Sequence, residues 1–186
     1  MSLYQNKYRI ESARLKEWDY KNAGWYYVTV CTKNHISWFG KVINCKMILN
    51  KLGKIVAREW RQTESIRKNI ELDYFVVMPN HIHGILIINH VETTGSVVSH
   101  QKNSETIHRI VSTTLQPDSL GAVIGQIKSV CTKQIRSLGY KNFAWQPRFY
   151  ERIIRNEKEL YKIRNYIYQN PLRWELEKEM PENIDL

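Results

Sequence analysis

Cysteine is scarce in this sequence, and the few cysteines present do not form a framework. Three of them, Cys31, Cys45 and Cys131, are spread over 186 residues without any Cys-x-x-Cys spacing. An odd, scattered set argues against a disulfide network and against a zinc ribbon. We therefore expect reduced thiols, as in a cytoplasmic protein.

Long apolar runs are absent as well. No stretch is apolar for long enough to span a bilayer, and residues 1–14 are polar and mixed in charge, with no apolar signal core. The hydrophobic fraction of 42% is ordinary for a globular protein. Because a chain of this length can bury a real core, we expect one domain over residues 1–186 and no membrane partner.

Acidic residues are in the minority, with 18 Asp and Glu against 28 Lys and Arg and a formal net charge of +10. Together with 11 Tyr and 6 Trp, this excess suits a surface that binds phosphates and stacks on bases. A basic protein whose charge serves only its solubility is the alternative. The composition favours nucleic-acid binding without identifying the nucleic acid.

Cations and aromatic rings are interleaved in residues 1–23, which we interpret as an N-terminal arm. Arg9 and Arg14 lie between Tyr8 and Trp18 in this segment. Such an arm could lie on DNA, with its cations on phosphates and its rings on bases. An ordinary extension packed on the domain fits the pattern equally well.

Residues 74–88 contain the most informative pattern. Two short runs rich in β-branched and aromatic residues flank Pro79 and Asn80, which predicts two strands joined by a tight turn. Side chains two apart in a strand project from one face, so the imidazoles of His81 and His83 should stand side by side. They could hold a divalent metal or a phosphate, or they could be two half-buried histidines with ordinary hydrogen-bond partners.

Local signals predict the other elements. We expect a strand, a hairpin, a helix capped by Asn50, a helix capped by Ser119, a strand with Pro147 near its start, and a helix ended by Pro171. In order, these elements occupy residues 24–32, 38–49, 51–63, 120–138, 143–155 and 156–170.

Three further features lie outside or on the surface of these elements. Residues 89–119 are rich in Ser, Thr, Gln and Asn with little apolar periodicity, so we expect a long flexible insertion. Residues 172–186 form a charged tail in which Trp174 is the expected anchor. Candidate DNA contacts, for which a solvated basic surface is the commoner explanation, are Lys128, Lys133 and Arg148.

The order of elements predicts an α+β fold. Strand, helix, strand, strand, helix, strand is the βαββαβ order of a ferredoxin/RRM-like antiparallel sheet with helices on one face. We expect the two middle strands at the centre of the sheet. The extra C-terminal helix can then cross the open face and bring Tyr166 and Asn170, which are one helical turn apart, to the histidine pair.

Three motifs in this order give the chain a resemblance to a known family. They are Val77-Met78-Pro79-Asn80-His81-Ile82-His83-Gly84, Trp145-Gln146-Pro147-Arg148-Phe149-Tyr150-Glu151 and Arg164-Asn165-Tyr166-Ile167-Tyr168-Gln169-Asn170-Pro171. The chain resembles the REP-associated tyrosine transposases, which are single-tyrosine members of the HUH endonuclease superfamily. The resemblance extends over most of the chain, including residues 8–15 and 73–77, but residues 89–119 have no match.

The resemblance implies an activity. His81 and His83 match the family's metal-binding histidines, Asn170 matches an amide-bearing position where related insertion-sequence transposases carry Gln, and Tyr166 matches the nucleophile. The implied cofactor is Mg²⁺ or Mn²⁺, which would polarise the scissile phosphate. Attack by Tyr166 would leave a 5′-phosphotyrosine and a free 3′-hydroxyl, and reversal would rejoin DNA without ATP.

The implied partner is single-stranded DNA beside a hairpin of the REP type, in the prokaryotic cytosol or nucleoid. A monomer is favoured over a homodimer. The phenol, with an ordinary pKa of about 10, needs help to lose its proton, and no carboxylate base is evident in the sequence.

Competing residues and functions remain open at this stage. Tyr168 lies roughly 200° around the helix from Tyr166, Tyr161 is also off its face, and Tyr150 is better explained as structural. The rival functions are a host-adopted DNA-binding protein with weak or no catalysis, an RNA-binding module on the same sheet, and a replication initiator or relaxase-like nickase.

Overall fold

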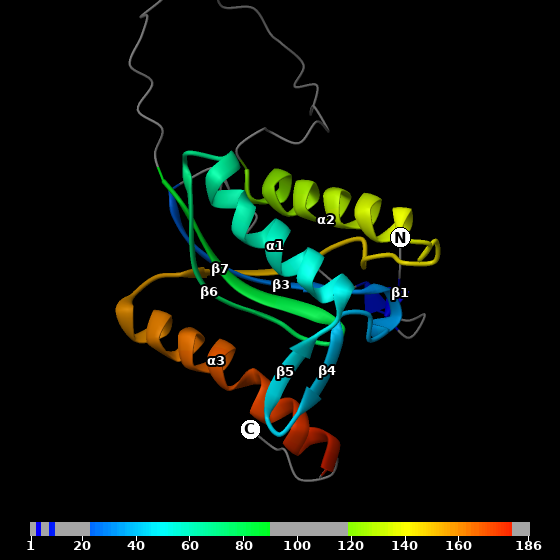
Figure 1. Ribbon diagram of the computed structural model, residues 1–186. Coiled ribbons are helices and arrows are strands. Elements are labelled where there is room, and N and C mark those ends of the chain that lie inside the picture. The colour runs from blue at the N-terminus through cyan, green and yellow to red at the C-terminus, as the bar shows by residue number, and fades with distance from the viewer. Residues whose placement is uncertain (1–2, 5–7, 10–22, 90–118, 180–186) are drawn as a thin grey trace, which may run out of the picture.

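The computed structural model describes residues 3–4, 8–9, 23–89 and 119–179 (Figure 1). Within the predicted arm, the structure describes β1 (Leu3–Tyr4), β2 (Tyr8–Arg9) and residue 23, and the two strands pair antiparallel. Arg14 and almost all of the predicted insertion at 89–119 lie outside the described residues. The expectations for these segments therefore stay predictions.

The main sheet has four antiparallel strands, which are β3 (Gly24–Cys31), β6 (Ile70–Val77), β7 (His81–Ile88) and β8 (Tyr150–Ile154). Their order across the sheet is β6-β7-β3-β8. This confirms the predicted fold class, but the expectation that both middle strands are central is wrong, because β6 lies at an edge. The crossover from β3 to β6 leaves one place between them, and β7 fills it by pairing with both.

Helices cover the two faces of the sheet unequally (Figure 1). One face lies under α1 (Lys51–Ile66) and α2 (Leu120–Ser137), as predicted, and α3 (Glu157–Glu179) crosses the other. The two predicted caps are present. The Asn50 side chain accepts hydrogen bonds from the backbone N–H groups of Leu52 and Gly53 at 2.9 and 3.0 Å, and Ser119 accepts one from Ala122 at 3.3 Å.

The α1–sheet contact depends on a glycine. A Cβ atom at Gly84 would lie 2.2 Å from Cζ2 of Trp60, well inside any permissible contact. The indole of Trp60 is fully buried there. The absence of a side chain at Gly84 therefore lets α1 approach β7 closely.

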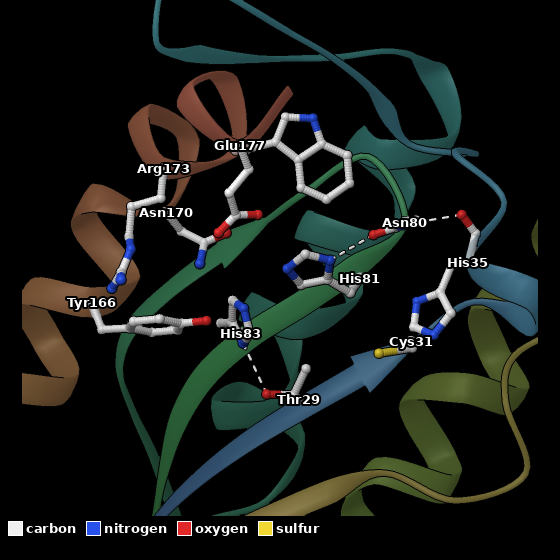
Figure 2. Close-up of a pocket in the computed structure, with 11 residues that line it drawn as sticks. Thr29, Cys31, His35, Asn80, His81, His83, Tyr166, Asn170, Arg173 and Glu177 are labelled. Carbon is white, nitrogen blue, oxygen red and sulfur yellow. Dashed lines mark hydrogen bonds between the residues drawn. The ribbon is translucent and has the colours of Figure 1, made fainter. Parts of the chain in front are cut away.

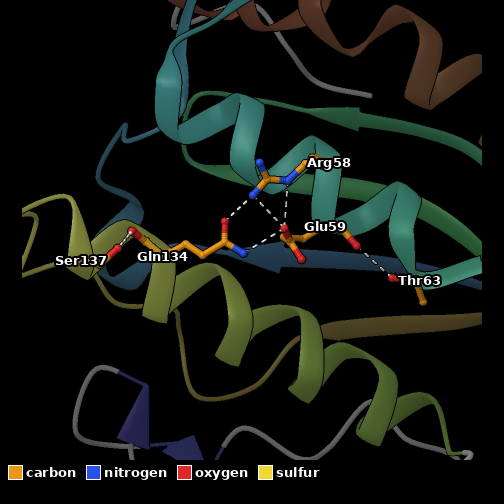
Figure 3. Close-up of polar contacts among 5 residues, drawn as sticks. All are labelled: Arg58, Glu59, Thr63, Gln134 and Ser137. Atoms are coloured by element: carbon orange, nitrogen blue, oxygen red, sulfur yellow. Dashed lines mark hydrogen bonds and ion pairs between the residues drawn. The ribbon is translucent and has the colours of Figure 1, made fainter. Parts of the chain in front are cut away.

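A polar network joins α1 to α2 (Figure 3). The carboxylate of Glu59, which is 8% exposed, accepts hydrogen bonds from Arg58 at 3.0 Å and from Nε2 of Gln134 at 2.9 Å. The Thr63 hydroxyl donates to the Glu59 carbonyl at 3.1 Å. The bonds from Arg58 and Gln134 satisfy the buried carboxylate, and the bond from Gln134 fixes how α2 lies against α1.

The predicted hairpin forms β4 (Gly40–Ile43) and β5 (Lys46–Leu49). Asn44 and Cys45 join the strands with φ values of 50° and 58°, as a tight two-residue hairpin turn requires. The backbone N–H of Cys45 donates to the carboxylate of Glu175 on α3. The hairpin thus supports the C-terminal half of that helix.

The strand predicted at 143–155 is shorter than expected, because β8 covers only Tyr150–Ile154. Residues 143–149 form a loop, in which Trp145 makes an isolated bridge with Thr32, the residue that follows β3. Phe143 and Trp145 are buried against Phe39. Their apolar character reflects packing of this loop on the core, and Pro147 lacks the N–H that a ladder needs.

The helix end predicted at Pro171 is wrong. α3 continues through this proline to Glu179. Proline removes one helical hydrogen bond and costs about 3 kcal/mol in a helix interior. Beyond it, Arg173, Trp174 and Glu175 are all partly buried, and their contacts offset that cost. In the part of the chain that the structure describes, no helix has the length and apolar character needed to cross a membrane.

Candidate active site

A cavity of about 440 Å³ lies between the open face of the sheet and α3 (Figure 2). Side chains from β7 and from α3 project into it from opposite sides (Figure 2). The lining residues on which the chemistry depends are His81, His83, Tyr166, Asn170, Arg173 and Trp174.

The two histidines stand side by side, as their spacing predicts. They project from β7 with ring centroids 4.4 Å apart. In the strand register, His81 is opposite Cys31 and His83 is opposite Thr29 on β3. The pair therefore sits on a central strand, where hydrogen bonds on both sides of β7 hold the backbone rigid.

His83 is held through one nitrogen. Its Nδ1 lies 2.7 Å from the hydroxyl oxygen of Tyr27 and 2.9 Å from that of Thr29. Burial raises the pKa of Tyr27, so this group stays an uncharged phenol. With Nδ1 engaged by β3, Nε2 is the nitrogen of His83 left for a ligand.

His81 is held in the same way by its neighbour. Its Nδ1 lies 2.6 Å from the amide oxygen of Asn80, whose Nδ2 donates to the carbonyl of His35 at 3.0 Å. An amide oxygen only accepts, so Nδ1 of His81 carries the proton and Nε2 keeps its lone pair. This Nε2 is buried and has no hydrogen-bond partner among the described residues. Its lone pair is therefore available to a ligand.

Burial also fixes the charge of the pair. It lowers the pKa of His81 to about 4, although the side chain of Asn170 opposes part of this shift. It lowers the pKa of His83 to about 3, with His81 adding to the effect. Both imidazoles are therefore neutral near pH 7. Neutral imidazoles suit a metal and supply no positive charge to a phosphate.

A metal held by the two histidines would need a further ligand that is not His, Cys, Asp or Glu. Among the described residues, no three His, Cys, Asp or Glu side chains gather so that they could hold an ion. Asn170 supplies an amide oxygen from α3. It is 6% exposed and lies close enough to His81 to influence its pKa.

Tyr166 reaches the histidines from one helical turn before Asn170. Its ring centroid lies 5.2 Å from that of His83 and 6.3 Å from that of Tyr27, edge-on in both cases. Figure 2 shows its hydroxyl directed toward His83. The phenol thus lies beside the pair, while 37% of the residue is exposed.

The competing tyrosines lie elsewhere. Tyr168 and Tyr161 are on α3 but 77% and 67% exposed, and neither lines the cavity. Tyr150 is on the outer strand β8, edge-on to Tyr27 with ring centroids 6.2 Å apart. Tyr166 is the one tyrosine that lines the cavity in the described part of the chain.

Three lining residues on α3 were not predicted to belong to the site, although Trp174 was expected to anchor the tail: Arg173, Trp174 and Glu177. The guanidinium of Arg173 lies 5.3 Å from the ring centroid of Tyr166, and the Trp174 ring lies 5.8 Å from that of His81. With Tyr166 and Asn170 they form a stripe at helical spacing. The stripe is visible in the sequence, but only if the helix continues beyond Pro171.

The predicted basic DNA contacts are not brought into the cavity. The Lys128 ammonium is already engaged, because it donates to the backbone carbonyls of Gln146 and Pro147. Lys133 is exposed on α2, which covers the opposite face of the sheet, and Arg148 is exposed in the loop before β8. Arg9 is described only as backbone. DNA contacts by these residues therefore stay predictions, and Lys128 is the least suited of them.

Comparison with known proteins gives a relative in sequence and a likeness of fold. No family model matches the chain. An uncharacterized protein of Haemophilus influenzae (strain ATCC 51907 / DSM 11121 / KW20 / Rd) is 34% identical over 165 residues, which cover 88% of this chain and 89% of that protein. The solved structure of a REP-associated tyrosine transposase bound to a REP hairpin matches 87% of this chain and 74% of that chain, with a TM-score of 0.55 and 21% identity.

These two findings differ in what they establish. The first is a likeness of sequence along nearly the whole of both chains, whereas the second, at its low identity, is a likeness of fold. The chain therefore belongs to one family with the Haemophilus influenzae protein, and it has the fold of a REP-associated tyrosine transposase.

Proposed function

We propose that this chain is a transposase of the REP-associated tyrosine kind, an HUH endonuclease that nicks and rejoins single-stranded DNA through Tyr166. The observation that carries the proposal is the convergence of a phenol, two neutral imidazoles and a buried amide on one cavity. These groups come from β7 and α3, which are separated by 68 residues. Binding alone has no need for all four.

The donor set fits a divalent metal. His81 and His83 each have Nδ1 engaged and Nε2 available, and Nε2 of His81 is an orphaned buried acceptor among the described residues. Together with the amide oxygen of Asn170 they would hold Mg²⁺ or Mn²⁺. When bound, such an ion acts as a Lewis acid toward the scissile phosphate.

The residues of the chain carry the remaining steps. The hydroxyl of Tyr166 attacks phosphorus, the P–O3′ bond breaks, and the 5′-phosphate stays on the tyrosine while a free 3′-hydroxyl leaves. Reversal with another 3′-hydroxyl rejoins DNA with no input of ATP, because each P–O bond replaces another.

The substrate class follows from charge and from the likeness of fold. A net charge of +10 suits a polyanion, and the transposase of like fold was solved with a REP hairpin. We propose that this chain acts as a monomer in the cytoplasm on single-stranded DNA that carries a hairpin. An RNA-binding module would present exposed aromatic rings on the central strands, where this chain has His81 and His83 beneath α3.

The test is formation of a covalent adduct. Labelled single-stranded hairpin DNA from the flanks of the gene is incubated with the protein and Mn²⁺ or Mg²⁺, then run on a denaturing gel. We expect a metal-dependent adduct that is lost in Tyr166→Phe and His81→Ala and kept in Tyr168→Phe, the matched control on the same helix. An adduct that persists in Tyr166→Phe would contradict the assignment, and tight binding without any adduct would favour a DNA-binding protein that lacks catalysis.

A further inference from the structure

Arg173 is the only permanently charged cation that lines the cavity in the described part of the chain. It lies on α3 one turn beyond Asn170 and two turns beyond Tyr166. Its guanidinium carbon is 5.3 Å from the ring centroid of Tyr166. Figure 2 shows the Arg173 side chain extending along α3 toward the Tyr166 side chain.

The guanidinium is not neutralised by a neighbour. Arg173 forms no ion pair with an acidic group of the described residues, although Glu177 lines the same cavity one turn farther along α3. Arginine presents several N–H donors in a rigid fork that matches phosphate oxygens. An unpaired fork beside a phenol is therefore a ready site for an anion.

The rest of the cavity supplies little positive charge of its own. Arg173 is the only Lys or Arg side chain in its lining among the described residues, and Glu177 contributes negative charge. During attack, the negative charge on the non-bridging oxygens of the phosphate increases as a fifth oxygen joins the phosphorus. A fixed cation at this position stabilises that increase.

We propose that Arg173 binds the non-bridging oxygens of the scissile phosphate and remains on them in the phosphotyrosine. This inference rests on the proposed function. In the step it assists, the Tyr166 oxygen bonds to phosphorus as the P–O3′ bond breaks. The phenolic proton passes to solvent and the leaving 3′-oxygen takes up a proton, so that atoms and charge balance without any oxidant or reductant. The class of ligand is a phosphodiester, and the guanidinium contributes charge and two parallel hydrogen bonds.

The decisive experiment changes the substrate together with the protein. Adduct formation is timed for wild type and Arg173→Ala on a hairpin with an ordinary scissile phosphate. It is then timed on the same DNA with a neutral methylphosphonate at that position, each diastereomer separately. Arg155→Ala is the matched control, because Arg155 is exposed and lies outside the cavity.

On the ordinary phosphate we expect Arg173→Ala to slow adduct formation about 100-fold or more, with affinity for uncleaved hairpin changed far less. On one methylphosphonate diastereomer the difference between wild type and variant should fall below about 10-fold, because the missing negative charge no longer needs the guanidinium. Arg173→Lys, which keeps charge but not the fork, should lie between the two. Arg155→Ala should react like wild type on every substrate.

Three results would overturn the inference. One is an Arg173→Ala variant that reacts at the wild-type rate, and another is a defect of equal size on both substrates, which would indicate a structural role. If Arg173→Ala fails to fold, the same comparison with Arg173→Lys decides, and an unchanged defect on methylphosphonate would count against phosphate binding. The third is distinct: a wild type that binds the hairpin but forms no adduct overturns the proposed function, and this inference with it.

Discussion

The two faces of the sheet are made by the same strands but packed with different chemistry. Under α1 and α2, every second residue of β3 and β7 joins a large apolar core around Trp60. Examples are Val28, Val30 and Ile82. Under α3, the alternate residues include Thr29, His81 and His83. The alternation of a strand thus separates a stabilising face from a reactive one at single-residue spacing.

The α3 face is itself divided along its length. Its apolar cluster includes Ile85, Ile154, Leu160 and Ile167, which pack the N-terminal half of α3 on the sheet. The cavity begins at Tyr166 and follows the C-terminal half. A small core at one end therefore holds the helix in place, so that the other end can present polar groups to a space that water or DNA can enter.

The face of the sheet under α1 and α2 thus stabilises the fold, and the face under α3 carries the reactive groups. Large losses of stability should come from substitutions under α1 and α2. Large losses of activity should come from substitutions under α3. Matched pairs of substitutions, one on each face, test that division.

The largest effect on stability should come from Trp60 on the stabilising face, and Trp174 is its matched partner on the reactive face. Trp60→Ala empties the centre of the core and should lower the free energy of unfolding by about 3–5 kcal/mol. Trp174→Ala removes a ring from the cavity wall and should cost less than about 1 kcal/mol while slowing adduct formation. Urea unfolding measures both, and equal losses of stability would contradict the division.

A change of pH should affect the reactive face selectively, because all three described histidines line the cavity. Unfolded histidines titrate near pH 6.5, whereas burial lowers the pKa of His81 to about 4 and that of His83 to about 3. As pH falls below about 6.5, the unfolded state takes up protons that the folded state refuses. Stability is therefore intact above that pH and is lost on acidification toward pH 4.

At about 1.4 kcal/mol per unit of pKa, His81 alone should remove about 3 kcal/mol by pH 4. Urea unfolding with metal chelated, at several values of pH from 7 to 4, measures this. The His81→Gln/His83→Gln double variant should lose less stability over the same interval. An identical acid slope in the variant would mean that the histidines are not buried and neutral in the folded protein.

Local signals predicted much of this architecture, because they depend only on neighbours in sequence. Asn50 and Ser119 cap the helices that they were expected to cap, and the His81–His83 spacing placed both rings on one face. The fold class followed from the order of elements. Each of these depends on backbone geometry that tertiary contacts did not override.

The errors came from features that only tertiary packing decides. Pro171 is a helix-ending signal, yet α3 passes through it because residues beyond it pack against the cavity and the β4–β5 hairpin. That mistake concealed the place of Arg173 and Glu177 in the cavity and assigned Trp174 to a tail instead of to the cavity wall. Apolar residues 143–149 looked like a strand because burial of a loop and burial of a strand leave the same composition. The edge position of β6 depends on how crossovers place strands, which no local pattern records.

A smaller effect should follow from the polar network on the stabilising face. Glu59→Gln removes the negative charge to which Arg58 and Gln134 donate hydrogen bonds. It should lower the free energy of unfolding by about 1–2 kcal/mol, because hydrogen bonds to this buried group are then no longer charge-assisted. Glu64→Gln, on the exposed side of the same helix, should cost less than about 0.5 kcal/mol. Urea unfolding compares the two. If Glu59→Gln left the free energy of unfolding unchanged, the network would order the helices without stabilising them. Adduct formation should be unchanged in both variants.

The smallest expected effect concerns the ion pair between Arg164 on α3 and Asp73 on the edge strand β6. Arg164 donates to Asp73 at 2.8 Å, with 35% and 13% of the two side chains exposed. The guanidinium also lies 5.8 Å from the ring centroid of Trp25 and 5.6 Å from that of Tyr74. Because solvent reaches the pair, Asp73→Asn should cost only about 0.2–1 kcal/mol, and the ring contacts should keep Arg164 in place. The difference from wild type should shrink in about 1 M salt, where the Debye length is about 3 Å.

Since α3 carries both Tyr166 and Asn170, this variant also tests how firmly the helix must be held for the reaction. Adduct formation slowed far beyond the small loss in stability would mean that the pair positions the nucleophile, and that the boundary between the stabilising and reactive surfaces lies within α3 itself.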